Sequence, residues 1–190
     1  MSPTNRLLGL LCVAASLCLC WASWISPARA DTIPVKSAQL RAEDESYALE
    51  AQFDVAFNST LEEALQKGVS LYFVLEFELS RPRWYWLDEK VVAESIQYRI
   101  SYSPLTQQYR VTSGLLSQQF ASLDEVEHLL SRVASRPVVA ADALTKGARY
   151  EAAVRLRLDV TQLPKPFQVN ALASREWSLQ SEWYRWSFTP

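Results

Sequence analysis

The sequence predicts a mainly β protein with antiparallel sheets, because apolar and polar residues alternate over several segments that are separated by turn residues. The alternation is clearest in residues 47–57, 69–79, 96–102 and 150–160. Successive side chains of a strand point to opposite faces, so each segment predicts a strand with one buried and one wet face. Half-wet strands of this type are typical of antiparallel sheets, since parallel sheets are usually covered on both faces.

Turn residues support this division of the chain. Residues 103–106, Ser-Pro-Leu-Thr, predict a hairpin turn in which Pro104 fixes φ at the second position. Residues 163–166, Leu-Pro-Lys-Pro, indicate an extended connector, because proline cannot donate to a β-ladder.

Two short helices are predicted, over residues 59–68 and 122–135, and each begins with a Ser-x-x-Glu capping box. The two boxes pair Ser59 with Glu62 and Ser122 with Glu125. Several strands with two small helical insertions favour an antiparallel β-sandwich, immunoglobulin-like in character, as the fold class.

The N-terminus resembles an export signal. Residues 7–25 carry no charge, and Ala28-Arg29-Ala30 forms a small-x-small cleavage signature. Cleavage after Ala30 predicts a signal peptide over residues 1–30, a single domain over residues 31–190 and a periplasmic location. The alternative is an inner-membrane anchor formed by residues 7–25, which are long enough to span a bilayer if the leader is not cleaved.

Composition restricts the chemistry of the mature chain. Cys12, Cys18 and Cys20 all lie in the leader, so the mature domain has no thiol ligand, nucleophile or disulfide. The full chain has a net charge of −2, and loss of Arg6 and Arg29 with no acidic residue shifts it to −4. An acidic balance argues against a nucleic-acid partner, and against an anionic membrane surface unless the leader stays in place.

Catalytic and metal sites are not expected. His128, the only histidine, lies opposite the apolar stripe of its helix and is expected to be solvated. Without cysteine, the common zinc sites cannot be assembled, and no cofactor motif is present. The enzymatic alternative is a carboxylate hydrolase using Glu76 and Glu78, which Glu50 or Asp54 would face from a neighbouring strand. The competing interpretation pairs these glutamates with Arg155 and Arg157 across the sheet.

Aromatic residues are the remaining candidates for a binding surface. Residues 81–87, Arg-Pro-Arg-Trp-Tyr-Trp-Leu, place three aromatics beside two arginines, and the C-terminal strand ends in further tryptophans. The candidate surface consists of Arg81, Arg83, Trp84, Tyr85, Trp86, Trp183 and Trp186. The competing interpretation is core packing, in which the tryptophans close the fold and Arg81, Arg83 and Tyr85 stay exposed.

Five segments, in order along most of the mature chain, resemble a bacterial family catalogued as domain of unknown function 4390. They are "SRPRWYWLDEKV", "YRISYSPLTQQYRV", "FASLDEVEHLLSRV", "YEAAVRLRLDVTQLPKPFQVNAL" and "EWSLQSEWYRW". The resemblance implies an exported proteobacterial protein, and a membrane sensor kinase as a candidate partner. It implies no activity, cofactor or catalytic residue.

The expected function is therefore a non-catalytic interaction domain of the periplasm or cell envelope with a protein partner. The alternatives are a glycan or small-ligand module that uses exposed aromatics, and the carboxylate hydrolase.

Overall fold

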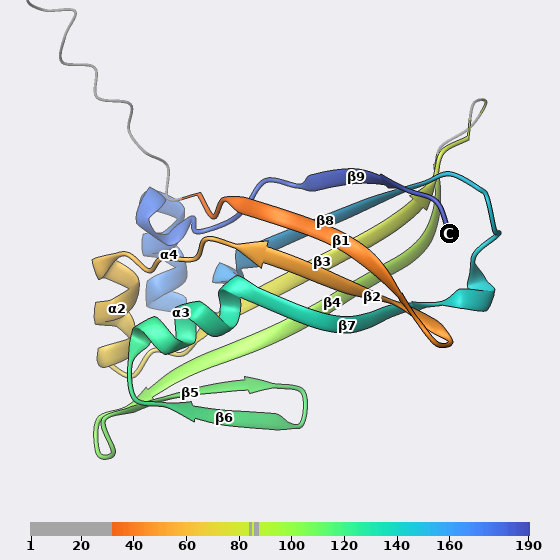
Figure 1. The fold of residues 1–190 in the computed structure, drawn as a ribbon. Coiled ribbons are helices and arrows are strands. Elements are labelled where there is room, and N and C mark those ends of the chain that lie inside the picture. The colour runs from red at the N-terminus through yellow and green to blue at the C-terminus, as the bar shows by residue number, and fades with distance from the viewer. Residues whose placement is uncertain (1–31, 84, 86–87) are drawn as a thin grey trace, which may run out of the picture.

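The computed structural model describes residues 32–83, 85 and 88–190, the side chain of Leu172 excepted. The predicted signal peptide, Trp84 and Trp86 lie outside the described residues. Within the described part, the protein is mainly β and has two antiparallel sheets and three α-helices (Figure 1).

The smaller sheet has three strands in the order β1 (Val35–Glu43), β2 (Ser46–Phe53) and β7 (Arg132–Ala140). β2 is central and alternates as predicted, with Leu49, Ala51 and Phe53 buried. The pairing of β2 with β7 shifts between Leu49 and Ala51. At this bulge Ser135 has a φ of 40°. This left-handed conformation is unfavourable for any residue that has a Cβ atom.

The larger sheet has six strands in the order β6-β5-β4-β3-β8-β9. Their bounds are β6 (Leu116–Phe120), β5 (Gln108–Ser113), β4 (Glu89–Ser103), β3 (Leu71–Arg81), β8 (Tyr150–Leu158) and β9 (Tyr184–Phe188). The odd residues of β3 are buried from Leu71 to Leu79, as the alternation predicts. β8 lies beside β3 in register, so Leu75 is opposite Leu156 and Phe77 is opposite Val154.

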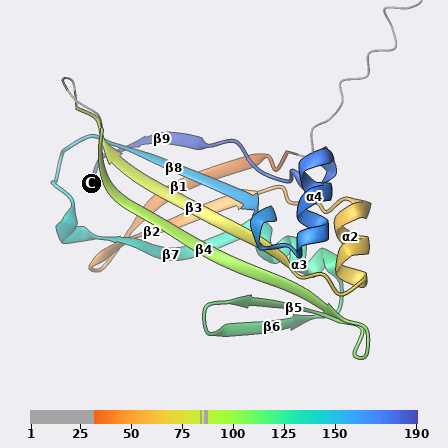
Figure 2. The same ribbon diagram turned by 180° about the vertical axis from the view of Figure 1, so that it is seen from behind.

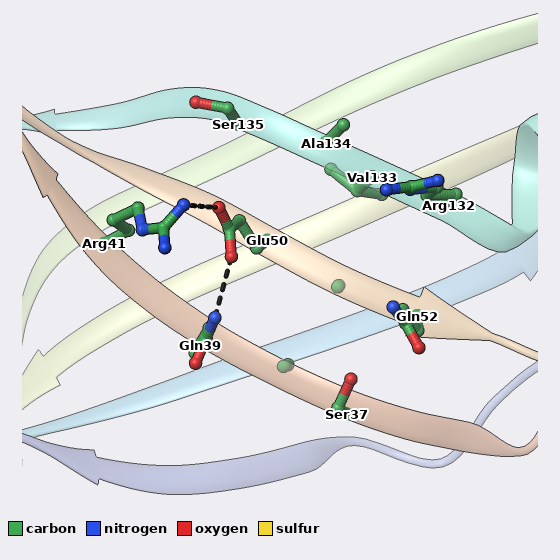
Figure 3. A pocket seen from close by; sticks show the side chains of 11 residues that line it. Ser37, Gln39, Arg41, Glu50, Gln52, Arg132, Val133, Ala134 and Ser135 are labelled. Carbon is green, nitrogen blue, oxygen red and sulfur yellow. Dashed lines mark hydrogen bonds and ion pairs between the residues drawn. The ribbon is translucent and has the colours of Figure 1, made fainter.

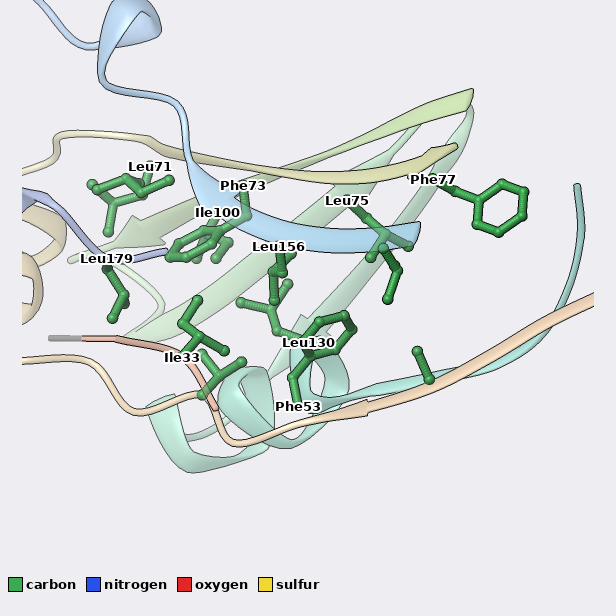
Figure 4. Packing of buried hydrophobic residues seen from close by; sticks show 14 of the residues in the cluster. Ile33, Phe53, Leu71, Phe73, Leu75, Phe77, Ile100, Leu130, Leu156 and Leu179 are labelled. Atoms are coloured by element: carbon green, nitrogen blue, oxygen red, sulfur yellow. The ribbon is translucent and has the colours of Figure 1, made fainter. Parts of the chain in front are cut away.

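Residues of both sheets share one hydrophobic core. Figure 4 shows side chains of β3 and β8 pointing toward Ile33, Phe53 of β2 and Leu130 of α3. Ile33, Phe53, Phe73 and Leu156 are each at most 2% exposed. Burial of apolar surface on this scale is the main force that holds the two sheets together.

The helices lie together at one end of the molecule, opposite the β3–β4 hairpin tip (Figures 1 and 2). They are α2 (Ser59–Gln66), α3 (Leu123–Ser131) and α4 (Lys165–Ala173). Single 3₁₀ turns occur at η2 (Ala141–Ala143), η3 (Val160–Gln162) and η4 (Arg175–Trp177). α3 buries Val126 and Leu130 against the core, and the predicted capping box of Ser122 and Glu125 is confirmed.

Several predicted boundaries are wrong. α2 is capped by Asn58, whose side chain accepts the N–H of Leu61 at 3.0 Å, so Ser59 is already helical. α3 ends at Ser131, and the predicted continuation to residue 135 is part of β7, because β2 offers that segment a ladder. α4 was not predicted: Pro166 is tolerated in its first turn, where the proline needs no hydrogen-bond donor.

The two sheets meet differently on their two sides. On one side β1 and β9 lie close together, and the N–H of Ile33 donates to the carbonyl of Gln180 at 2.9 Å. On the other side β7 and β4 also come close, but among the described residues no backbone hydrogen bond or bridge joins the two sheets there. We call these the closed side and the open side.

Candidate functional site

The open side contains a long unpaired strand edge. β4 has 15 residues and pairs with β3 over nearly its whole length, whereas β5 pairs only with Arg99–Ser103. Residues 89–98 therefore have a hydrogen-bonded neighbour on one side only. Such an edge presents backbone N–H and C=O groups that another chain can pair with.

Two charged residues lie on inward faces of the strands along this edge. Glu94 is opposite Phe77 in register and so shares the inward face of the sheet, yet its side chain is exposed. Arg136 is opposite Leu49 on the inward face of the smaller sheet and is also exposed. Burial raises the pKa of Tyr98, and the nearby charge of Arg136 partly offsets this rise. Two exposed charges thus lie on the inward faces of β4 and β7, although these strands come close to each other.

A cavity of about 520 Å³ lies where β5 diverges from β4. We call it the fork cavity; both ribbon views show the β5–β6 hairpin leaving β4 at this point (Figures 1 and 2). Its lining comes from β3, β4, the end of β5 and β7. The residues are Tyr72, Ser95, Ile96, Gln97, Arg99, Thr112, Ser113, Gly114 and Arg136.

The charges of the fork cavity come from Arg99 and Arg136, and no acidic residue lines it. The guanidinium of Arg99 lies over the ring of Tyr72, 5.9 Å from its centroid, and donates to Ser70 Oγ at 3.4 Å. Within the described residues, neither arginine forms an ion pair with a carboxylate. The cavity can therefore accept a negatively charged group that the chain itself does not supply.

The predicted aromatic surface is divided by the fold. Arg81, Arg83 and Tyr85 lie at the β3–β4 hairpin tip and are exposed, as expected, with Tyr85 65% exposed. Arg83 forms an ion pair with Glu89. The structure does not test the predicted roles of Trp84 and Trp86, since both lie outside the described residues.

Trp183 and Trp186 lie on opposite faces. Trp186 is opposite Ala152 on the inward face and packs against Phe77, with ring centroids 6.4 Å apart. Trp183 lies over Arg155, whose Cζ is 4.6 Å from the ring centroid. Arg155 is level with Glu76, five residues before Arg81, which places Trp183 roughly 17 Å from the hairpin tip. These residues therefore do not form one continuous platform.

Glu76 is held by two arginines on the outward face of the larger sheet. Arg155 Nε donates to its Oε2 at 2.7 Å, and Arg157 Nε donates to its Oε1 at 3.1 Å. Burial alone would raise the pKa of Glu76, but the hydrogen bonds and charges of Arg157 and Arg155 outweigh it and lower this pKa. The predicted cross-strand pairing with Arg155 and Arg157 is confirmed for Glu76. A general acid needs the opposite shift, so the geometry does not favour the hydrolase alternative.

The other carboxylates of that alternative are not arranged as expected. Glu78 pairs with Lys90 at 2.8 Å. Glu50 and Asp54 belong to the smaller sheet and the loop after it, not to a neighbour of β3, so the expectation that they face Glu76 is wrong. The sequence pattern identified the outward faces correctly but gave no information on which sheet each strand joins.

A second cavity, of about 390 Å³, lies on the smaller sheet (Figure 3). Glu50 accepts from Gln39 Nε2 at 2.7 Å and from Arg41 Nη1 at 3.1 Å within it. Its other polar lining residues are Ser37, Gln52, Arg132 and Ser135. No lining residue is aromatic, so it lacks the stacking surface of the predicted glycan module.

Metal ligands are not clustered in the described part of the chain: no group of three or more His, Cys, Asp or Glu side chains is placed to hold an ion there. His128 is exposed on α3, as expected. The helices of the described residues are all too short or too polar to cross a bilayer.

These observations define a mainly β domain with two antiparallel sheets, an unpaired strand edge and a basic cavity beside it. The chain belongs to the family described as domain of unknown function DUF4390, whose model matches residues 30–187. This confirms the resemblance seen in the sequence. No curated protein and no solved structure matches the chain.

The unpaired edge of β4 is the feature that sequence reasoning missed. The alternation of residues 96–102 predicted the second half of β4, whereas the signal weakens in the first half, where Val91 and Val92 are adjacent. The register shifts at this point. The mismatch between a long strand and a six-residue β5 becomes visible only once both are paired.

Proposed function

We propose that this protein is a non-catalytic interaction module of the cell envelope that binds an extended segment of a protein partner along the β4 edge. The observation that carries this proposal is the unpaired run of residues 89–98, which ends at the fork cavity. The envelope location rests on the export signal predicted for residues 1–30. A membrane sensor kinase is the partner that the family resemblance suggests.

The proposed binding mode is strand addition. The partner's backbone pairs with the free N–H and C=O groups of β4 and extends the larger sheet by one strand. Its side chains then alternate between the outward face and the opening between the sheets. Affinity comes from the backbone ladder, and specificity comes from the few side chains of this protein that flank the edge.

The arrangement of the two sheets is consistent with a β-sandwich that is closed on one side and open on the other. The core shared by both sheets supports the sandwich. The immunoglobulin-like character stays a prediction. No specific observation favours the glycan alternative. Trp84 and Trp86 lie outside the described residues, and the polar cavity of the smaller sheet has no aromatic lining residue.

The proposal can be tested with a photo-crosslinking amino acid at Ser95, on the unpaired edge, in cells that make the protein. We expect one discrete adduct, joined to an extended segment of an envelope protein. The matched control is Ser187, an exposed serine of β9 on the other edge of the same sheet. The same adducts from both positions, or none from Ser95, would show that the β4 edge is not the binding site.

A further inference from the structure

We infer that the segment bound at the β4 edge carries a carboxylate next to Arg136 and Arg99 and a basic residue next to Glu94, which sets how a given segment lies along the edge. This inference rests on the proposed strand addition and adds the chemistry of the partner. It follows from the order of charges along the edge and from the faces on which they lie.

The fork end of the edge is positive on both faces. Arg99 is opposite Tyr72 and Thr112 and lies on the outward face of β4, whereas Arg136 approaches Tyr98 from the inward face. An added strand passes between the two guanidinium groups. Contact with Tyr72 and Ser70 holds Arg99 in place before binding, which lowers the entropy cost of recognition.

The middle of the edge carries the opposite charge. Glu94 is exposed on the inward face, and in the described residues it has no ion pair. An isolated inward charge also protects a strand edge from unselective pairing, because an apolar strand would have to bury it. A partner with a basic residue at this position pairs with Glu94 and so removes the cost of burying its charge. Glu94 therefore favours partner strands that carry such a residue.

Strand geometry converts these positions into a sequence pattern. Tyr98, Ile96 and Glu94 share the inward face at successive second positions, so partner residues opposite them are also two apart. The partner residue opposite Tyr98 lies beside Arg136 and is acidic, the next is apolar against half-buried Ile96, and the third is basic against Glu94. The structure thus assigns the pattern acidic-x-apolar-x-basic from N to C for a segment that adds antiparallel to β4, and the reverse order for one that adds parallel.

The test is selection of random decapeptides displayed on phage against the immobilised full chain, followed by binding of the selected peptides in solution. We expect enrichment of the pattern and binding about tenfold or more weaker to R99Q/R136Q. The matched control is R110Q/R149Q, which removes equal charge from exposed positions outside the fork cavity. Selection against E94K is expected to replace the basic residue of the pattern with an acidic one.

Hydrogen exchange of residues 89–98 separates the two levels of the proposal. Selected peptides that protect this segment without any charge preference would overturn the charge pattern and leave strand addition standing. If no selected peptide protects it, both proposals fail. Each selected peptide is also measured with a free and with an amidated C-terminus. Equal binding shows that the carboxylate comes from a side chain, as the pattern requires. Loss of binding on amidation shows that it comes from the chain end, which would contradict the pattern.

Discussion

The closed and open sides of the molecule are built from the same type of alternating strand but differ in whether backbone hydrogen bonds connect the two sheets. On the closed side, the chain after β8 returns beside it, and Leu158 N–H donates to the carbonyl of Leu179 at 2.8 Å. Ser181 is 2% exposed and bonds Leu156 through both backbone and side chain. On the open side, residues 89–98 have no such neighbour. Backbone bonds between the chain segments, rather than hydrophobic pattern, therefore distinguish the closed side from the proposed binding side.

The largest expected contrast comes from the same substitution on the two sides. I33A removes a side chain that is 1% exposed on the closed side, and we expect it to lower the free energy of unfolding by roughly 2–5 kcal/mol. I96A removes a partly exposed side chain on the open side. It is expected to cost about 1 kcal/mol, because Ile96 buries less apolar surface than Ile33 does. Urea denaturation measures both values. Equal losses would show that the open side is packed as tightly as the closed one.

A smaller effect is expected at Ser181, whose Oγ accepts the N–H of Leu156 at 3.0 Å. S181A leaves that buried donor without its acceptor, which costs roughly 1–3 kcal/mol. S187A removes an exposed hydroxyl that bonds only Arg149 at 2.9 Å and is expected to change stability by less than about 0.5 kcal/mol. Thermal unfolding of both variants checks the difference, and similar shifts would mean that the closed side does not depend on this bond.

The ion pairs of Glu76 on the outward face of the larger sheet are expected to make stability sensitive to acid. The arginines lower the pKa of Glu76 below its ordinary value, so its contribution is present at neutral pH and is lost as the pH falls from about 4.5 through the lowered pKa. E76Q should cost about 1–2 kcal/mol at pH 7, limited by partial exposure of the pair. The difference from the native chain should shrink in acid. A difference in unfolding free energy between E76Q and the native chain that stays constant from pH 7 to pH 3 would contradict this linkage.

The smallest effect concerns Ser135 in β7, the other edge strand of the open side. S135G removes the cost of a left-handed φ, and we expect a gain of about 0.5 kcal/mol after allowance for the more flexible unfolded chain. A134G, one residue earlier, relieves no such strain and should lose about 0.5–1 kcal/mol. Chemical denaturation distinguishes the two signs, and a loss at both positions would show that the bulge is unstrained.

Much of the local structure could be predicted from the sequence. Alternation identified the buried faces of β2, β3 and β8, because the period of a strand decides which residues can share a core. The pairing of Glu76 with Arg155 and Arg157 followed from the same faces. The end of α3 did not follow, since residues 132–135 fit an apolar helical stripe and a β-ladder with β2 equally well.

The candidate site was predictable only in its separate parts. Gln97 and Arg99 could be recognised as outward residues of a strand, and the turn before β5 was recognised from Pro104. The point at which β5 stops pairing with β4 depends on contacts between distant segments. Arg136 reaches the same edge from the other sheet, 37 positions along the chain from Arg99, and nothing in its local sequence indicates that.

The sequence by itself determined that the protein is mainly β with antiparallel sheets, the inward and outward faces of its main strands, and the family, because these depend on local periodicity and on recognisable strings of residues. Only the tertiary structure decided which strands are neighbours, which edges stay unpaired and which charges meet beside the β4 edge. The physical reason is that a strand's own residues decide its faces, whereas its edges are satisfied by whichever distant segment packs against them.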